Sequence, residues 1–268
     1  MRTTSTGDGP QSVLGRATAI LEAFASDDGE LSLVTLALRT GIAKTTVYRI
    51  ANTLSELGLL ERLDGGYRLG IHLFELGERV TQQRELRQLA LPYMEDLYEA
   101  THDVVHLAVL QGVEVLYFAK ISGRRSAHFP TRVGGRMAAH CTALGKVIAA
   151  YSDPSVLNRI LDAGLSRVTA HTICVPQVFV DQLAQIKAAG YSIEREEAVI
   201  GNCCVAAPLL GKTGQPVAAI SVGVLANGFD PERLGLAVRT AALALSRELS
   251  RGNFSVRTPA VPNERKAR

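Results

Sequence analysis

Hydrophobic positions repeat at helical spacing in the first part of this chain. One apolar series follows Ser12, a second follows Ser32, and a third begins at Lys44, with Gly41 between the second and the third. Serine is a good helix N-cap, and glycine readily adopts the left-handed conformation that ends a helix. The pattern predicts three helices, over residues 13–26, 33–40 and 44–57, the last two joined by a tight turn.

The third series is followed by two short strand-like runs. Its apolar stripe consists of Val47, Ile50, Ala51, Leu54 and Leu57, after which Gly58 ends the helix. Residues 59–63 and 67–69 are apolar or alternating, and Asp-Gly-Gly at 64–66 is a turn signal. Three helices and a hairpin in this order predict a winged helix-turn-helix over residues 12–70.

The outer face of the third helix is polar and free of acids. No Asp or Glu lies between Glu30 and Glu56. A helix that enters the major groove of DNA presents hydrogen-bonding and basic side chains to base edges and phosphates. The candidate DNA-binding residues are Lys44, Thr45, Thr46, Tyr48, Arg49 and Asn52 on this helix and Arg62 and Arg68 beside the wing turn. The alternative is an ordinary helical hairpin with a solvated face.

A different pattern begins after a predicted linker helix over residues 71–83. Apolar positions at helical spacing continue to residue 101, with Pro92 expected to kink that helix or to mark a new start. Strands are predicted over 104–110, 113–121, 136–140, 191–197, 203–210 and 216–225, and helices over 142–151, 154–161, 178–189 and 231–250. The expectation is an α+β domain over residues 84–252 with a mainly antiparallel sheet, flanked by disordered tails at 1–11 and 253–268.

Charge and composition refine this picture. The chain of 268 residues has a formal net charge of +3, and residues 1–82 hold eight Lys or Arg against ten Asp or Glu. A near-neutral module needs more phosphate contacts than one copy supplies, which favours a homo-oligomer paired through the first helix and residues 73–80. We expect no membrane span or signal peptide, a cytoplasmic location, and no metal or cofactor, because the four cysteines lack zinc-site spacing.

Several segments, in the same order along the chain, resemble the IclR family of bacterial transcriptional regulators. The resemblance implies a GAF/PAS-like effector-binding domain, operator binding as a dimer or tetramer, and control of catabolic operons for small organic or aromatic acids. The matching segments are 11–13 (QSV), 41–49 (GIAKTTVYR), 67–70 (YRLG), 140–146 (HCTALGK), 190–201 (GYSIEREEAVIG), 204–208 (CVAAP) and 218–222 (AAISV).

The resemblance also implies an effector pocket. Its positions in this chain are Phe129, Met137, Ala143, Leu144, Glu194, Asn202, Cys204, Ser221 and Gly223. The residues themselves add a physical reason, since the N–H groups near Ala143, Leu144 and Gly145, at the start of the predicted helix, should have no partner within the helix and can bind an anion. The alternative is that these small residues only allow close packing of helix on sheet.

The expected ligand is a small carboxylate, aromatic or aliphatic. Its anionic end would lie on the N–H groups of Ala143 and Leu144, and its body against Phe129 and Met137. An ionised Glu194 can only accept a hydrogen bond, so the second end of the ligand should donate one, as a hydroxyl does. A diacid should bind more weakly because of repulsion between like charges.

Other chemical signals are weaker. Residues 211–213 (GKT) lack the first glycine and the following helix of a phosphate-binding loop, and residues 102–106 (HDVVH) enter a strand rather than a zinc-protease helix. The sequence thus predicts a ligand-responsive, DNA-binding transcriptional regulator. The alternative is an enzyme that performs chemistry with Cys204, Glu194 and Ser221.

Overall fold

The structure is a computed structural model that describes residues 12–25, 28–123 and 129–251. The predicted tails at 1–11 and 253–268 therefore lie outside the described residues. Contacts divide the chain into two compact units, residues 1–81 and residues 82–268. None of the helices in the described ranges has the length and apolar character needed to cross a membrane.

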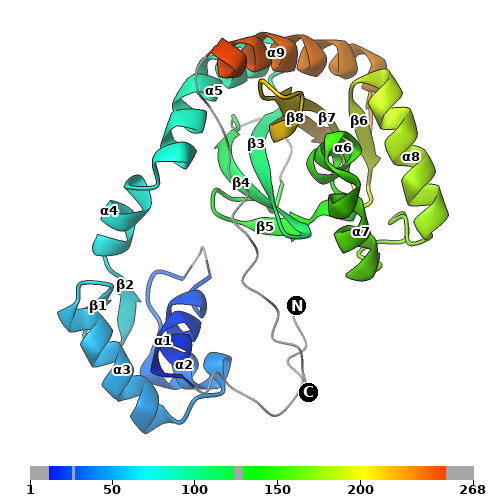
Figure 1. The fold of residues 1–268 in the computed structure, drawn as a ribbon. Helices are drawn as coiled ribbons and strands as arrows, with labels where there is room; N and C mark the ends of the chain where they lie inside the picture. The colour runs from blue at the N-terminus through cyan, green and yellow to red at the C-terminus, as the bar shows by residue number, and fades with distance from the viewer. Residues whose placement is uncertain (1–11, 26–27, 124–128, 252–268) are drawn as a thin grey trace. The chain divides into compact units, whose positions relative to one another are not determined.

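The N-terminal unit contains the three predicted helices, α1 (Val13–Glu22), α2 (Leu33–Thr40) and α3 (Lys44–Glu56) (Figure 1). The hydroxyl groups of Ser12 and Ser32 accept hydrogen bonds from N–H groups in the first turns of α1 and α2, as expected for N-caps. Gly41 has a φ of 67°, which provides the corner between α2 and α3. The predicted end of α1 near residue 26 is wrong, because the helix ends at Glu22, where the Ala23 N–H closes its last turn.

A two-stranded antiparallel wing follows the helices. It pairs β1 (Leu60–Arg62) with β2 (Tyr67–Leu69), and Tyr67 also bridges to Leu31. The core of the unit is formed by buried side chains of the three helices and the wing, among them Ile20, Leu36, Val47, Leu54 and Leu60. These features confirm the winged helix-turn-helix. Leu57 does not belong to the buried stripe, because it lies at the C-cap of α3 and is 59% exposed.

The linker consists of one short helix and the start of a long one. α4 spans His72–Glu78, and α5 begins at Thr81 and continues to Thr101, so the predicted single helix over residues 71–83 is interrupted. Pro92 lies inside α5 and does not start a new helix. Proline removes the hydrogen bond to the carbonyl four residues earlier, and that residue, Gln88, is exposed, so water can take the place of the missing N–H.

The C-terminal unit is built around a six-stranded sheet in which every neighbouring pair is antiparallel, as predicted. The strand order is β5-β4-β3-β8-β7-β6. The strands are β3 (Val104–Gln111), β4 (Glu114–Ile121), β5 (Arg136–Ala138), β6 (Ser192–Arg195), β7 (Asn202–Leu210) and β8 (Pro216–Leu225).

Helices cover both faces of this sheet (Figure 1). On one face, α5 and α9 (Pro231–Arg251) pack on alternate strand residues such as Val105 and Leu107. On the other face lie α6 (Ala143–Tyr151), α7 (Pro154–Asp162) and α8 (Pro176–Ala189), which follow a 3₁₀ turn at Ala139–Cys141. Because side chains alternate along a strand, His106 and Ala108 point to the α6 face, where the candidate pocket lies.

Candidate functional site

The exposed face of α3 carries the predicted DNA-binding residues. Lys44, Thr45, Tyr48 and Arg49 are exposed, and Thr46 is half-buried. The N-cap of α3 is Ala43, whose side chain cannot accept a hydrogen bond, so no side chain caps the first turn. Free N–H groups and a lysine at one helix end form an environment that suits a phosphate.

A hydrogen-bonded cluster joins α3 to the wing. The Tyr67 hydroxyl donates to Oδ1 of Asn52 at 3.1 Å. A hydrogen bond with Asn52 and the nearby Arg62 guanidinium lower the pKa of Tyr48. Asn52 is half-buried and takes part in this cluster, so it positions the wing against the helix as well as facing outward beside Tyr48.

The two wing arginines differ in their surroundings. Arg68 lies opposite Glu61 in the hairpin, and its Nε and Nη2 each donate to the Glu61 carboxylate at 2.8 Å. Arg62 lies beside Tyr48 instead. The sequence-based hypothesis treated the two as equivalent, because it did not consider that Glu61 and Arg68 would be paired across the strands.

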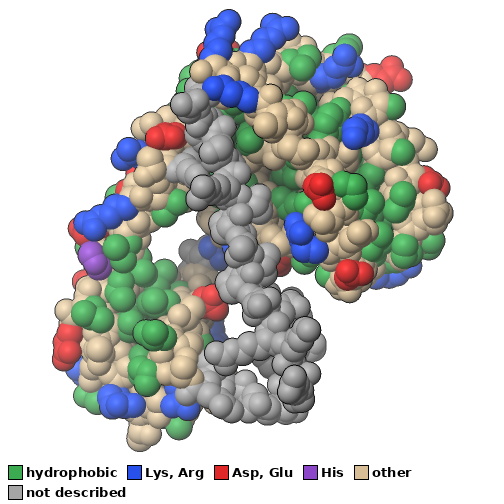
Figure 2. All heavy atoms as spheres, viewed as in Figure 1, with side chains coloured by type: hydrophobic (Ala, Val, Ile, Leu, Met, Phe, Trp, Pro, Cys, Tyr) green, Lys and Arg blue, Asp and Glu red, His purple; other side chains and the backbone are tan. Residues whose placement is uncertain are grey.

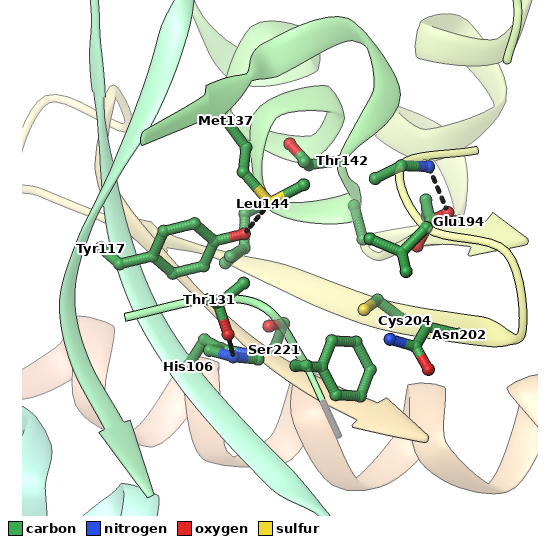
Figure 3. A pocket seen from close by; sticks show the side chains of 14 residues that line it. His106, Tyr117, Thr131, Met137, Thr142, Leu144, Glu194, Asn202, Cys204 and Ser221 are labelled. Atoms are coloured by element: carbon green, nitrogen blue, oxygen red, sulfur yellow. Dashed lines mark hydrogen bonds between the residues drawn. The ribbon is translucent and has the colours of Figure 1, made fainter. Parts of the chain in front are cut away.

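A cavity opens between α6 and its side of the sheet in the C-terminal unit (Figure 3). It encloses about 390 Å³ free of protein atoms, part of it continuous with solvent. The lining residues are His106, Tyr117, Phe129, Thr131, Met137, Thr142, Ala143, Leu144, Glu194, Ala198, Val199, Asn202, Cys204 and Ser221. Eight of the nine predicted effector-binding residues are among them.

The ninth, Gly223, does not line the cavity. A Cβ atom at Gly223 would lie 2.5 Å from Cζ of Phe129. The glycine therefore makes room for the Phe129 ring, and the ring closes this side of the cavity. Gly223 influences the pocket through Phe129 rather than through a contact of its own.

Six lining residues were not predicted as pocket residues from the sequence, namely His106, Tyr117, Thr131, Thr142, Ala198 and Val199. His106 Nε2 and Thr131 Oγ1 lie 2.8 Å apart and share a hydrogen bond. Burial, and to a smaller extent the charge of Lys120, lower the pKa of His106 to about 3, so its imidazole is neutral at physiological pH. Residue alternation along the predicted strands 104–110 and 113–121 could have placed His106 and Tyr117 on this face.

The start of α6 offers fewer free N–H groups than expected. Thr142 is the N-cap, and its Oγ1 accepts a hydrogen bond from the N–H of Gly145 at 3.1 Å. The expectation that Gly145 would add a donor for an anion is therefore wrong, while Ala143 and Leu144 line the cavity. A Cβ atom at Gly145 would lie 2.2 Å from the Ala139 carbonyl oxygen, so close packing explains this glycine.

Glu194 lies at one end of the cavity, and its Oε1 accepts hydrogen bonds from the N–H groups of Glu197 and Ala198 (Figure 3). Burial raises the pKa of Glu194 to about 7, against the opposing effects of these bonds and of Lys146. The sequence analysis treated this carboxyl as ionised and did not take its burial into account. Burial and the neighbouring Glu194 also raise the pKa of the Cys204 thiol, which makes it a poor nucleophile.

A buried ion pair supports the strand end that carries Glu194. Lys146 is 0% exposed, and its Nζ donates to the Ile193 carbonyl at 2.9 Å and to Oε1 of Glu197 at 2.6 Å. Thr172 Oγ1 donates to the Glu197 carbonyl at 2.8 Å and holds the loop from a second side. The sequence analysis assigned no role to Lys146 or Glu197, because a lysine in an apolar helix gives no indication of its partner.

Comparison with known proteins identifies both units. The family model for the bacterial transcriptional regulator IclR C-terminal domain matches residues 78–250, and that for the IclR helix-turn-helix domain matches residues 13–64. This chain belongs to the IclR family. Both the suspected family and the fold class are therefore confirmed, and this IclR-family chain is a DNA-binding transcriptional regulator. The alternative that the pocket is an enzyme active site is rejected, because the family consists of regulators.

Relatives of this IclR-family chain cover most of its length. It is 34% identical over 248 residues to the glycerol operon regulatory protein of Streptomyces coelicolor, covering 90% of this chain and 97% of the relative. It is 32% identical over 240 residues to the transcriptional regulator XynR of Escherichia coli, covering 87% and 95%. A solved IclR homologue from Microbacterium hydrocarbonoxydans, complexed with 4-hydroxybenzoate, superposes with a TM-score of 0.82 at 29% identity, covering 89% and 99%.

Proposed function

We propose that this chain is a cytoplasmic regulator of a catabolic operon, and that a small organic acid bound in the C-terminal cavity controls its binding to the operator. The observation that carries the proposal is the hydroxyl of Ser221. Its Oγ is buried in the cavity wall and has no hydrogen-bond partner among the described residues. A buried polar group without a partner is costly, and a polar atom of a ligand would satisfy it.

The anionic end of the acid belongs at the start of α6. Ala143 and Leu144 line the cavity there, in the first turn of the helix, where N–H groups lack partners within the helix. Phe129 and Met137 supply apolar surface for the body of the ligand, and Glu194, Asn202 and Ser221 supply polar contacts for its other end. The similar structure from Microbacterium hydrocarbonoxydans, which holds 4-hydroxybenzoate, supports an aromatic hydroxy acid.

DNA contacts are assigned to the exposed side of α3 and to the wing. In this proposal Arg49, Thr45, Thr46, Tyr48 and Asn52 face the bases, and Lys44 contacts a phosphate beside the uncapped start of α3. Arg62 and Arg68 contact the backbone or the minor groove. The surface exposure of Lys44, Arg49 and Arg62 supports this assignment.

The functional form is proposed to be a homodimer or a homotetramer. The N-terminal unit exposes apolar side chains on α1 and around α4, where Leu14 is 80% and Phe74 is 64% exposed. Figure 2 shows hydrophobic side chains gathered on one face of this unit, next to a histidine. Such a surface suits pairing with a second copy. Sedimentation should show at least a dimer at micromolar concentration, and a monomer would contradict the assignment.

The test of function combines DNA and ligand. The fluorescence anisotropy of a labelled fragment from the region upstream of the gene would be measured with 4-hydroxybenzoate, benzoate and the neutral 4-hydroxybenzyl alcohol. We expect the acids to shift the affinity for DNA and to be recovered unchanged. If the neutral alcohol has the same effect as its acid, the assignment of an anion site is contradicted. If no acid changes the affinity for DNA, the proposed effector class is overturned.

A further inference from the structure

Lys146 is a cation whose charge acts on Glu194, but its ammonium is paired with another carboxylate. None of the described lining residues is Lys or Arg, and the His106 imidazole on β3 is neutral. The ammonium of Lys146 on α6 is held by the Ile193 carbonyl and by Oε1 of Glu197. Its charge is therefore largely balanced by the carboxylate of Glu197 rather than by Glu194.

The two oxygens of the Glu194 carboxyl have different surroundings. Both backbone donors, the N–H groups of Glu197 and Ala198, point to Oε1. An oxygen that already accepts two hydrogen bonds is a poor place for a proton, so the neutral form of the group carries its proton on Oε2. In that form Oε2–H is a donor, whereas the ionised form can only accept.

Of the other groups that act on Glu194, the Glu197 carboxylate is paired with Lys146, whereas the cysteines and Tyr117 keep their protons near neutral pH. Burial raises the pKa values of Cys204 on β7 and Tyr117 on β4, and it raises that of Cys141, just before α6, to about 12. Lys120, on β4, donates to the carbonyls of Phe129 and Thr131 at 3.0 and 2.8 Å and so points at the backbone of the cavity wall. Glu194 is the group whose protonation a ligand can change.

We propose that Glu194 meets an acidic effector as a neutral carboxylic acid, so that an anionic effector that finds Glu194 ionised enters the pocket together with one proton from solvent. The proton binds to Oε2, and no other bond forms or breaks. The physical reason is that two carboxylates in one poorly solvated cavity repel each other strongly, and protonation of one removes that cost. The inference rests on the proposed function, since it concerns the same pocket and an acid as its ligand.

The proposal makes Glu194 a determinant of specificity. As a neutral acid it donates a hydrogen bond to an acceptor oxygen at the second end of the ligand, which a hydroxyl or a carboxylate can offer. The expected penalty for a diacid then applies only at a pH where Glu194 has lost its proton. Acid binding should thus become weaker and more selective for monoacids as the pH rises.

The sign of the pH dependence follows from linkage. In the free protein the pKa of Glu194 is about 7, and a bound anion raises it further. Well below pH 7 the group is already protonated, so the affinity for the acid does not change with pH and no proton is taken up. Above pH 7 each binding event must also protonate Glu194, so affinity falls by up to about tenfold for each pH unit.

Calorimetry measures the proton directly. Benzoate and 4-hydroxybenzoate would be titrated into the full chain at pH 5.5, 7 and 8, each in two buffers that differ in ionisation enthalpy. We expect a proton uptake near zero at pH 5.5, about half a proton at pH 7, and a value approaching one at pH 8. The proton count of the unmodified protein is a test by itself, independent of any variant.

The variant Glu194→Gln tests whether Glu194 is the group that takes up the proton. The amide oxygen can accept the same two N–H bonds, and the amide NH₂ can donate as Oε2–H would, so the variant should bind both acids with no proton uptake and a level affinity from pH 5.5 to 8. Glu232→Gln, at an exposed position of α9, is the matched control and should behave as the unmodified chain.

The outcomes are distinguishable. Binding of the acids with no proton uptake and no pH dependence would overturn this inference and leave the proposed function in place. Proton uptake that persists in Glu194→Gln would assign the proton to another group and overturn it as well. Failure of every acid to bind at any pH would overturn the proposed effector site, and this inference with it.

Discussion

The ammonium of Lys146 and the carboxylate of Glu197 form a buried ion pair, with Nζ 2.6 Å from Oε1. Their side chains are 0% and 6% exposed, and Oε2 of Glu197 has no hydrogen-bond partner among the described residues. Two charges removed from water stabilise a fold only as a pair, because each alone would be left unsolvated. The pair connects α6, which starts at the proposed anion site, to the loop whose N–H groups bind Glu194.

Breaking this pair should destabilise the C-terminal unit. We expect Lys146→Met to lower the free energy of unfolding by about 3–5 kcal/mol, because it leaves Glu197 charged and buried. The double variant Lys146→Met with Glu197→Leu should lose less than the single one. Urea denaturation followed by circular dichroism measures both. Lys187→Met, at an exposed lysine of α8, is the control and should change stability by less than about 0.5 kcal/mol.

Arg49 and Lys44 should differ in the kind of contact that they make with DNA. Arg49→Ala should cost about 1–3 kcal/mol on the operator and relax specificity, if the guanidinium pairs with a base. Lys44→Ala should weaken all DNA sequences alike and reduce the salt slope by about 1. Gel-shift titrations at several salt concentrations distinguish the two effects. Unchanged operator affinity in Arg49→Ala would contradict the assignment of α3 as the reading helix.

The wing arginines should contribute unequally. Arg62→Ala should weaken operator binding by about 1.5–3 kcal/mol, because a charged hydrogen bond is lost. Arg68→Ala should cost less, since Arg68 is already paired with Glu61 and must give up part of that pair to contact DNA. Footprinting of the double variant checks the role of the wing, and a footprint of unchanged width would show that both arginines are solvated surface charges.

The glycine beneath Phe129 should control the shape of the cavity. In Gly223→Ala the new Cβ atom must displace the Phe129 ring, which lies 2.5 Å away, so we expect a loss of about 1–3 kcal/mol in stability and an altered affinity for acids. Thermal unfolding and calorimetry with benzoate measure the two effects. Gly77→Ala, in α4, is the control, because nothing lies within 4 Å of a Cβ atom there. Benzoate affinity equal to that of the unmodified chain would contradict the role given to Phe129.

Local signals along the chain predicted most of the secondary structure and the order of the two units. The caps at Ser12 and Ser32 and the left-handed turn at Gly41 were predictable, since each depends on a few neighbouring residues. Short turns between successive strand-like runs, such as Gln111-Gly112, likewise predicted an antiparallel sheet. Errors occurred at helix ends, where local signals compete, as at Glu22, where α1 ends earlier than predicted.

Contacts between side chains that are distant in the chain could not be predicted in this way. The sequence predicted residues of the pocket but not their contacts. It did not predict that Gly223 lies against Phe129 or that the N–H of Gly145 donates to the Thr142 hydroxyl. It also did not predict that His106 lines the cavity. Glu194 was also assumed to be ionised. The protonation of a carboxyl depends on its burial and on the charges around it. For Glu194 both are set by the fold, which brings Lys146 from a distant part of the chain next to Glu197, so the residues adjacent in sequence do not predict them.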